Sequence, residues 1–155
     1  MMSPVVASLT LALSLLQSTP ASRPDFSGSW AMDASRSQSS ESTTLKIKQS
    51  ATEITIETQS GGKTSTRTFA FEASKHPASE TISTGHAHAS WDGSILVNED
   101  VGTISGQTVS YRQLRYLNAP GTEMTVETMT IVQHGYSMQG GKTHKTTKDV
   151  FVRAK

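Results

Sequence analysis

Alternation between polar and apolar residues runs through most of this chain and constrains its fold more than any other feature. Beyond the N-terminal stretch, no window of eleven or more residues repeats its apolar residues with the 3.6-residue period of an amphipathic helix. Residues 44–49 and 53–57 alternate and are joined by a short polar link, which predicts a hairpin whose apolar side chains share one face. The sequence therefore predicts an all-β protein.

Further strands are expected along the rest of the chain. Residues 28–33 form the first expected strand, residues 66–72 follow a glycine turn, and residues 148–153 form the last. Two more hairpins are expected, one within 81–101 that turns at Asp92-Gly93, and one that joins 109–117 to 124–131 through the turn 118–121. About eight strands joined in sequence are typical of a small antiparallel up-and-down β-barrel, and a two-sheet sandwich is the alternative.

Composition limits the partners of this chain. Cysteine is absent, so no disulfide framework stabilises the fold. The net charge is +1, which argues against nucleic acid or an anionic membrane surface as the main partner. Only 34% of the residues are hydrophobic, and Ser and Thr are abundant, as expected for an antiparallel sheet with one solvated face.

The N-terminal stretch has the pattern of a secretory signal. An uncharged apolar run from Val5 to Leu16 is followed by small residues up to Ala21. A membrane anchor needs about 20 apolar residues, and this run is shorter and is interrupted by Ser and Thr. A short anchor or a buried helix is the alternative. We therefore expect a signal peptide over 1–21, a single domain over 22–155, and an exported protein, periplasmic or secreted, with no membrane span after cleavage.

Two short motifs at opposite ends of the chain resemble the closing signature of the calycin superfamily, which includes lipocalins, fatty-acid-binding proteins and avidins. They are Gly28-Ser29-Trp30 and Arg153 at the end of the last expected strand. The whole expected domain resembles small exported bacterial lipocalin-like domains. The resemblance implies that Trp30 crosses the barrel floor, and that Arg153 lies over its ring and bonds to carbonyls of the opening segment. Gly28, Trp30 and Arg153 are thus the expected closure residues, and the barrel is favoured over the sandwich.

The resemblance also implies an interior cavity, and alternation suggests what lines it. Trp91 would share a face with small residues, which would leave space beside an aromatic wall. Tyr111 and Arg115 share one face of their strand, and Arg112 and Tyr116 share the other, so either register offers an aromatic–arginine pair. These five residues are the candidates for binding a small hydrophobic or amphipathic ligand with one polar group. The alternative is that these arginines are solvated surface charges.

His86 and His88 form the one metal-like pattern in the sequence. On a strand the two imidazoles would point to the same face, about 6–7 Å apart. Neutral imidazoles bind zinc or copper, but a tetrahedral site needs one or two further ligands. The alternative places both histidines on the solvent face or in a polar interior.

Catalysis and cofactors have little support in the sequence. No nucleophile elbow, zinc-protease helix or phosphate-binding loop is present, and there is no thiol nucleophile. The sequence therefore predicts an exported, monomeric, lipocalin-like barrel that binds a small ligand without catalysis or cofactor. The alternatives are a metal-binding protein or metal-dependent enzyme that uses His86 and His88, and an envelope interaction or structural module without a cavity.

Overall fold

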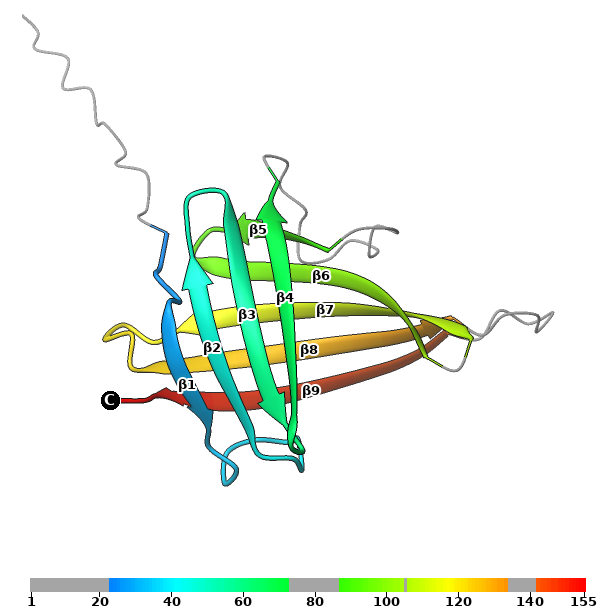
Figure 1. Ribbon diagram of the computed structural model, residues 1–155, viewed down its shortest axis with the longest axis horizontal. Coiled ribbons are helices and arrows are strands. Elements are labelled where there is room, and N and C mark those ends of the chain that lie inside the picture. Colours follow the sequence, from blue (N-terminus) through cyan, green and yellow to red (C-terminus); the bar gives the residue numbers. More distant parts are fainter. Residues whose placement is uncertain (1–22, 73–86, 105, 134–141) are drawn as a thin grey trace, which may run out of the picture.

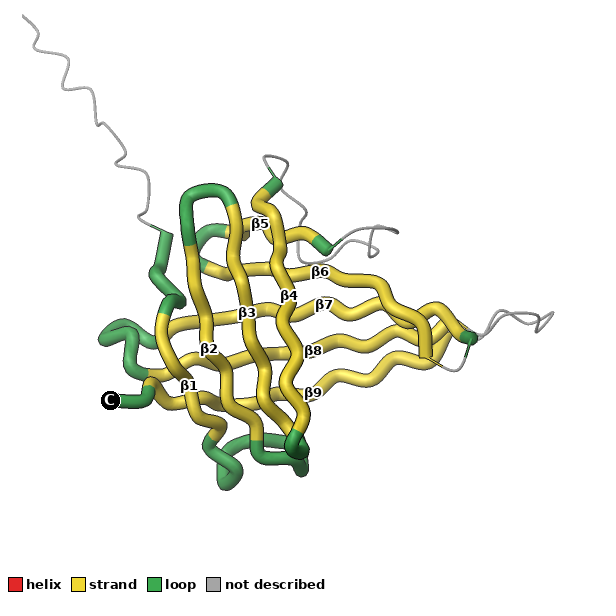
Figure 2. The backbone as a smooth tube through the Cα atoms, viewed as in Figure 1, coloured by secondary structure: helices red, strands yellow, loops and turns green. Residues whose placement is uncertain are grey.

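The computed structural model describes residues 23–72, 87–104, 106–133 and 142–155, and every regular element in these ranges is a strand. Figure 1 labels the strands, and Figure 2 shows the backbone coloured by secondary structure. Their bounds are β1 Gly28–Met32, β2 Thr43–Gln49, β3 Glu53–Ser60, β4 Lys63–Phe71, β5 His88–Asp92, β6 Ile95–Ile104, β7 Gln107–Leu117, β8 Glu123–Gln133 and β9 Lys142–Arg153. The expected signal segment 1–21 lies outside the described residues.

The strands pair in sequence order and close into a barrel, which confirms the predicted fold class. Within the described ranges there are nine strands rather than about eight, and both arms of the hairpin around Gly93 belong to the barrel, as expected. That hairpin turns through Gly93 and Ser94, one residue later than expected, since Asp92 is still paired with Ile95. Gly93 has a φ of 60°, which glycine adopts without strain.

One pair corrects the expectation of a wholly antiparallel barrel. β4 and β5 run parallel and are paired through Ala70↔His88 and Phe71↔Ala89. A parallel pair needs a connection of a dozen or more residues, whereas a hairpin needs only a few. Residues 72–87 supply that length. The remaining pairs are antiparallel.

The barrel has two walls that cross at a steep angle. In Figure 1, β1–β4 run from top to bottom across β6–β9, which run from left to right, and β5 lies at the upper edge. The apolar residues of the inner faces meet between the walls, with Phe26 and Trp30 among the most deeply buried. No helix within the described ranges combines the length and hydrophobicity that crossing a bilayer requires.

The two ends of the chain meet where β1 pairs with β9. Trp30 lies opposite Arg153, and the Arg153 guanidinium carbon is 4.2 Å from the centre of the indole ring. Arg153 also donates from Nε to the Gly121 carbonyl at 2.9 Å, and from its two other nitrogens to the carbonyls of Ser27 and Asp25. The guanidinium therefore links the first strand, the last strand and the β7–β8 turn.

Replacing Gly28 by Ala is expected to lower the free energy of unfolding by about 2–4 kcal/mol. Gly28 has a φ of 132°, and an added Cβ would lie 2.6 Å from Nη1 of Arg153, whose guanidinium is held on several sides. Gly62→Ala is the matched control, because Gly62 has a φ of 75° with no heavy atom within 4 Å of the added Cβ. Urea unfolding should show a loss of only about 1–2 kcal/mol there. Equal losses of stability in the two variants would mean that the close contact between the added Cβ and Arg153 has no measurable cost.

Candidate functional site

A cavity of about 270 Å³ lies between the two walls of the barrel. The wall formed by β1–β4 contributes four apolar side chains to it, Met32, Leu45, Ile56 and Phe69, and three polar ones, Thr43, Thr58 and Arg67. The opposite wall contributes polar side chains from β7, β8 and β9, namely Gln113, Arg115, Thr128, Thr147 and Asp149, together with Val126 and Phe151. The cavity therefore combines apolar surface with a small number of polar groups, as small-molecule sites do.

Arg115 is the most unusual of these polar groups. Arg115 as a whole is only 2% exposed to solvent. Its guanidinium donates from Nη2 to Oε1 of Gln113 at 2.7 Å and from Nη1 to Oδ1 of Asn98, while its Nε has no hydrogen-bond partner within the described ranges. No carboxylate in those ranges pairs with it. Burial lowers the pKa of Arg115 to about 10, so the side chain is still charged at neutral pH.

Asp149 also lines the cavity, and its carboxylate oxygens are hydrogen-bonded to the β1–β2 loop. Oδ1 accepts from the backbone nitrogens of Gln38 and Ser39 at 3.1 and 2.8 Å, and Oδ2 accepts from the Ser39 hydroxyl at 2.6 Å. Arg115 and Asp149 lie on either side of Val126, two strands apart, which corresponds to about 10 Å. Asp149 therefore fixes the β1–β2 loop, and within the described ranges it forms no ion pair with Arg115.

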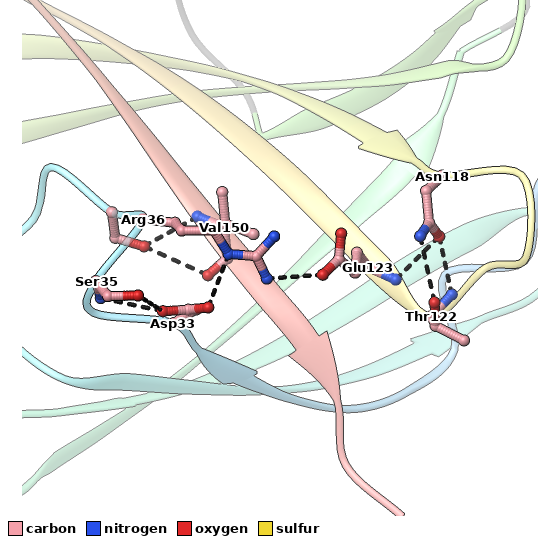
Figure 3. A network of polar contacts seen from close by, with 8 residues as sticks. Asp33, Ser35, Arg36, Asn118, Thr122, Glu123 and Val150 are labelled. Carbon is pink, nitrogen blue, oxygen red and sulfur yellow. Dashed lines mark hydrogen bonds and ion pairs between the residues drawn. The ribbon is translucent and has the colours of Figure 1, made fainter.

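The β1–β2 loop, residues 33–42, forms part of the rim of the cavity. Arg36 bridges Asp33 at 2.8 Å and Glu123 at 2.7 Å, and Figure 3 shows how this joins the loop to β8 across β9. Hydrogen bonds from Ser35, and then from Arg36, lower the pKa of Asp33 to about 2. Asn118 and Thr122, in the same view, form the adjacent β7–β8 turn. These contacts hold Ser39, which lines the cavity, against β9.

Arg67 of β4 lies at another part of the cavity lining. Its Nε is 3.2 Å from Oδ2 of Asp100 on β6, although β4 and β6 are not paired strands. Asp100 is oriented by the backbone nitrogen of Val101, which donates to its Oδ1 at 2.9 Å. The Arg67 side chain is 61% exposed, so this charge is solvated, unlike that of Arg115.

The structure separates the five ligand-binding candidates of the sequence. Arg115 lines the cavity, and Tyr111 shares its inner face farther along β7, opposite Asp100. Arg112 and Tyr116 lie on the other face of β7, away from the cavity. Trp91 packs with Phe26 and Phe71 at ring-centre distances of 6.1 and 5.7 Å, and is not part of the cavity lining.

The two histidines considered as metal ligands are not brought into a metal-like cluster that the structure describes. His86 lies outside the described residues. The Nε2 atom of His88 is 2.9 Å from Oε2 of Glu99, whose Oε1 is 3.3 Å from Nε of Arg112, and all three side chains are buried. Within the described ranges, no group of three or more His, Cys, Asp or Glu side chains converges as metal ligands do.

Most of the polar residues around the cavity were not predicted as site residues, and three of them show why. Gln113 shares a face with Arg115 by simple alternation, so this signal was available in the sequence. Asn98 reaches Arg115 only through the pairing of β6 with β7, and Asp149 reaches the cavity only through the pairing of β8 with β9. Those registers are long-range features that no local motif encodes.

Comparisons with known proteins give similarity in structure alone. No protein-family model and no curated protein matches the sequence. Among solved structures, the wild-type fluorescent protein UnaG aligns with a TM-score of 0.47 and 16% identity, over 83% of this chain and 97% of that one. A structure described as REP1-NXSQ fatty acid transporter aligns with a TM-score of 0.39 and 10% identity, over 83% of this chain and 96% of that one.

Proposed function

We propose that this barrel binds a small amphipathic anion in its cavity, with Arg115 as the group that holds the negative charge. The observation that carries the proposal is the buried guanidinium of Arg115, which has two neutral acceptors and no carboxylate partner within the described ranges. The role proposed is binding rather than catalysis.

The energetics of a buried charge support an anionic partner. A charge removed from water is costly unless it is paired, and amide oxygens compensate only part of that cost. Arg has five N–H donors, and Asn98 and Gln113 occupy two of them. A carboxylate could accept two parallel hydrogen bonds from the remaining donors, which is the geometry that a guanidinium favours. The bound anion would supply the negative charge that no described carboxylate of the protein places beside Arg115.

The apolar wall accounts for the rest of the ligand. Leu45, Ile56 and Phe69 are each at most 6% exposed and face the same cavity as Arg115. Covering their surface with a hydrophobic group stabilises a complex by roughly 25 cal/mol for each Å² of apolar area buried. A molecule that is both anionic and partly apolar is therefore favoured over inorganic anions and over neutral hydrocarbons.

The test compares two probes that differ mainly in the head group, decanoate and decan-1-ol, by isothermal titration calorimetry at pH 7. A hydrogen bond to a charged group contributes about 1.5–3 kcal/mol, so decanoate should bind at least about tenfold more tightly. Raising the salt from 0.05 to 0.5 M should change this ratio little, because a buried pair is screened less than an exposed one. Equal affinity for the two probes would contradict the proposal.

Export is a separate proposal. We propose that residues 1–21 are removed during secretion, on the pattern of the N-terminal sequence. Mass analysis of the protein purified from its own host should then give a chain that begins near residue 22, and a full-length chain would contradict it.

A further inference from the structure

The inner face of β6–β9 changes from apolar to polar along the strands. Directly paired residues of antiparallel strands point to the same face, so the registers define rows of neighbouring side chains. The row nearest the floor consists of Leu117, Met124 and Phe151. The next row contains Leu96, Arg115, Val126 and Asp149, and the third contains Asn98, Gln113, Thr128 and Thr147. Beyond the floor, most of this wall can form hydrogen bonds.

The wall that faces these rows contributes an apolar patch to the same cavity, beside Thr43, Thr58 and Arg67. Leu45, Ile56 and Phe69 of β2, β3 and β4 line the cavity together with Gln113, Thr128 and Thr147. The two sets come from opposite walls, as the crossing of β2–β4 over β7–β9 in Figure 1 shows. The patch of Leu45, Ile56 and Phe69 is therefore suited to apolar surface, and the row of Gln113, Thr128 and Thr147 across from it is suited to hydrogen bonding.

Part of the hydrogen-bonding capacity of the polar wall is unused. Gln113 donates to the Thr128 hydroxyl at 3.2 Å and accepts from Arg115. Nδ2 of Asn98 is buried and has no hydrogen-bond partner within the described ranges. An alkyl chain laid along this wall would cover polar groups without bonding them, and each such group costs about 1–3 kcal/mol.

We infer that the ligand is a compact anion with hydrogen-bonding groups along one edge and an apolar opposite face, such as a hydroxylated aromatic carboxylate, rather than a simple alkyl-chain acid. This inference rests on the proposed anion site at Arg115. The carboxylate meets Arg115, the ring covers Leu45, Ile56 and Phe69, and the hydroxyl groups face the row of Gln113, Thr128 and Thr147. The cavity volume of about 270 Å³ is at the lower end of small-molecule sites, which favours a ligand smaller than most drugs.

The experiment compares three carboxylates of similar size by calorimetry at pH 6.5, namely decanoate, cinnamate and 3,4-dihydroxycinnamate. Sites built to hydrogen-bond a hydroxyl discriminate strongly against the analogue that lacks it. We therefore expect 3,4-dihydroxycinnamate to bind at least about tenfold more tightly than cinnamate and than decanoate.

A conservative variant tests whether the Thr147 hydroxyl contributes to this preference. Thr147→Val preserves the shape of the side chain and removes its hydroxyl. It should weaken 3,4-dihydroxycinnamate about fivefold and change cinnamate by less than about twofold, since one neutral hydrogen bond contributes about 1 kcal/mol. Thr125→Val is the matched control, because Thr125 lies on β8 between the inward-facing Met124 and Val126 and is not part of the cavity lining. It should leave both affinities unchanged.

The outcomes separate this inference from the proposed function. If decanoate binds as tightly as 3,4-dihydroxycinnamate, the inference of a ligand with a polar edge is wrong, while the proposed anion site at Arg115 stands. Equal weakening of both cinnamates by Thr147→Val would also overturn it, because that result reports a general change of the cavity. If none of the three carboxylates binds at 1 mM, the anion site fails, and the polar-edge ligand fails with it.

Discussion

Replacing Trp30 by Ala should lower the free energy of unfolding by about 3–5 kcal/mol, the loss typical of removing a large aromatic side chain from a core. Trp30 is 1% exposed, and its Nε1 donates to the Phe26 carbonyl at 2.9 Å. The substitution also removes the ring beneath Arg153, at the pair that joins β1 to β9. Domains of this kind are stable by only about 5–15 kcal/mol, so the loss is a large fraction of the total.

Urea unfolding followed by fluorescence measures this effect directly. The chain has two Trp residues, so Trp91 remains as the reporter in the Trp30→Ala variant. Trp91→Phe is the control, because it keeps an aromatic ring beside Phe26 and Phe71 and should cost less than about 2 kcal/mol. A loss below about 1 kcal/mol for Trp30→Ala would show that the indole does not support barrel closure.

Arg115→Met should weaken decanoate binding by about 10- to 100-fold while changing the free energy of unfolding by less than about 3 kcal/mol. Because burial lowers the pKa of Arg115 in the folded state to about 10, the protonated guanidinium opposes folding at every pH below that value. Removing the charge relieves roughly 3 kcal/mol, at about 1.4 kcal/mol for each pKa unit. Against this, the oxygens of Asn98 and Gln113 lose a donor, at about 1–3 kcal/mol each.

Calorimetry and urea unfolding of the same preparation separate binding from stability. Lys48→Met is the control, since Lys48 lies on β2 with its side chain exposed and is not part of the cavity lining. It should leave decanoate binding unchanged. A loss of stability above about 3 kcal/mol with unchanged binding would mean that Arg115 supports the fold rather than the ligand.

Local alternation was sufficient to predict the strands, because their hydrophobic pattern is a property of neighbouring residues. Leu45, Ile47, Ile54 and Ile56, expected on one face of a hairpin, are all buried in the core. The parallel pairing of Ala70 with His88 could not be predicted in this way. It depends on how the chain returns after residue 72, and no turn residue at either strand specifies that direction.

From the sequence, the candidate site could be predicted only as one of the two faces of β7. Alternation places Arg112 and Arg115 on opposite faces of β7, but only the packing of the whole barrel decides which face is inside. Burial does not distinguish them either, since both arginines are buried in the structure. What distinguishes them is their partners, because Arg112 meets the carboxylate of Glu99 whereas Arg115 meets two amides.

The short contact between β4 and β5 also determines where this closed wall is weakest. Two residue pairs join these strands, whereas the β8–β9 ladder runs from Glu123↔Val152 to Gln133↔Lys142. Local opening costs least where the fewest hydrogen bonds and packed side chains must separate. Within the described ranges, that place is the seam beside Ala70 and Phe71. Amide hydrogen exchange is therefore expected to be faster at this seam than along the β8–β9 ladder.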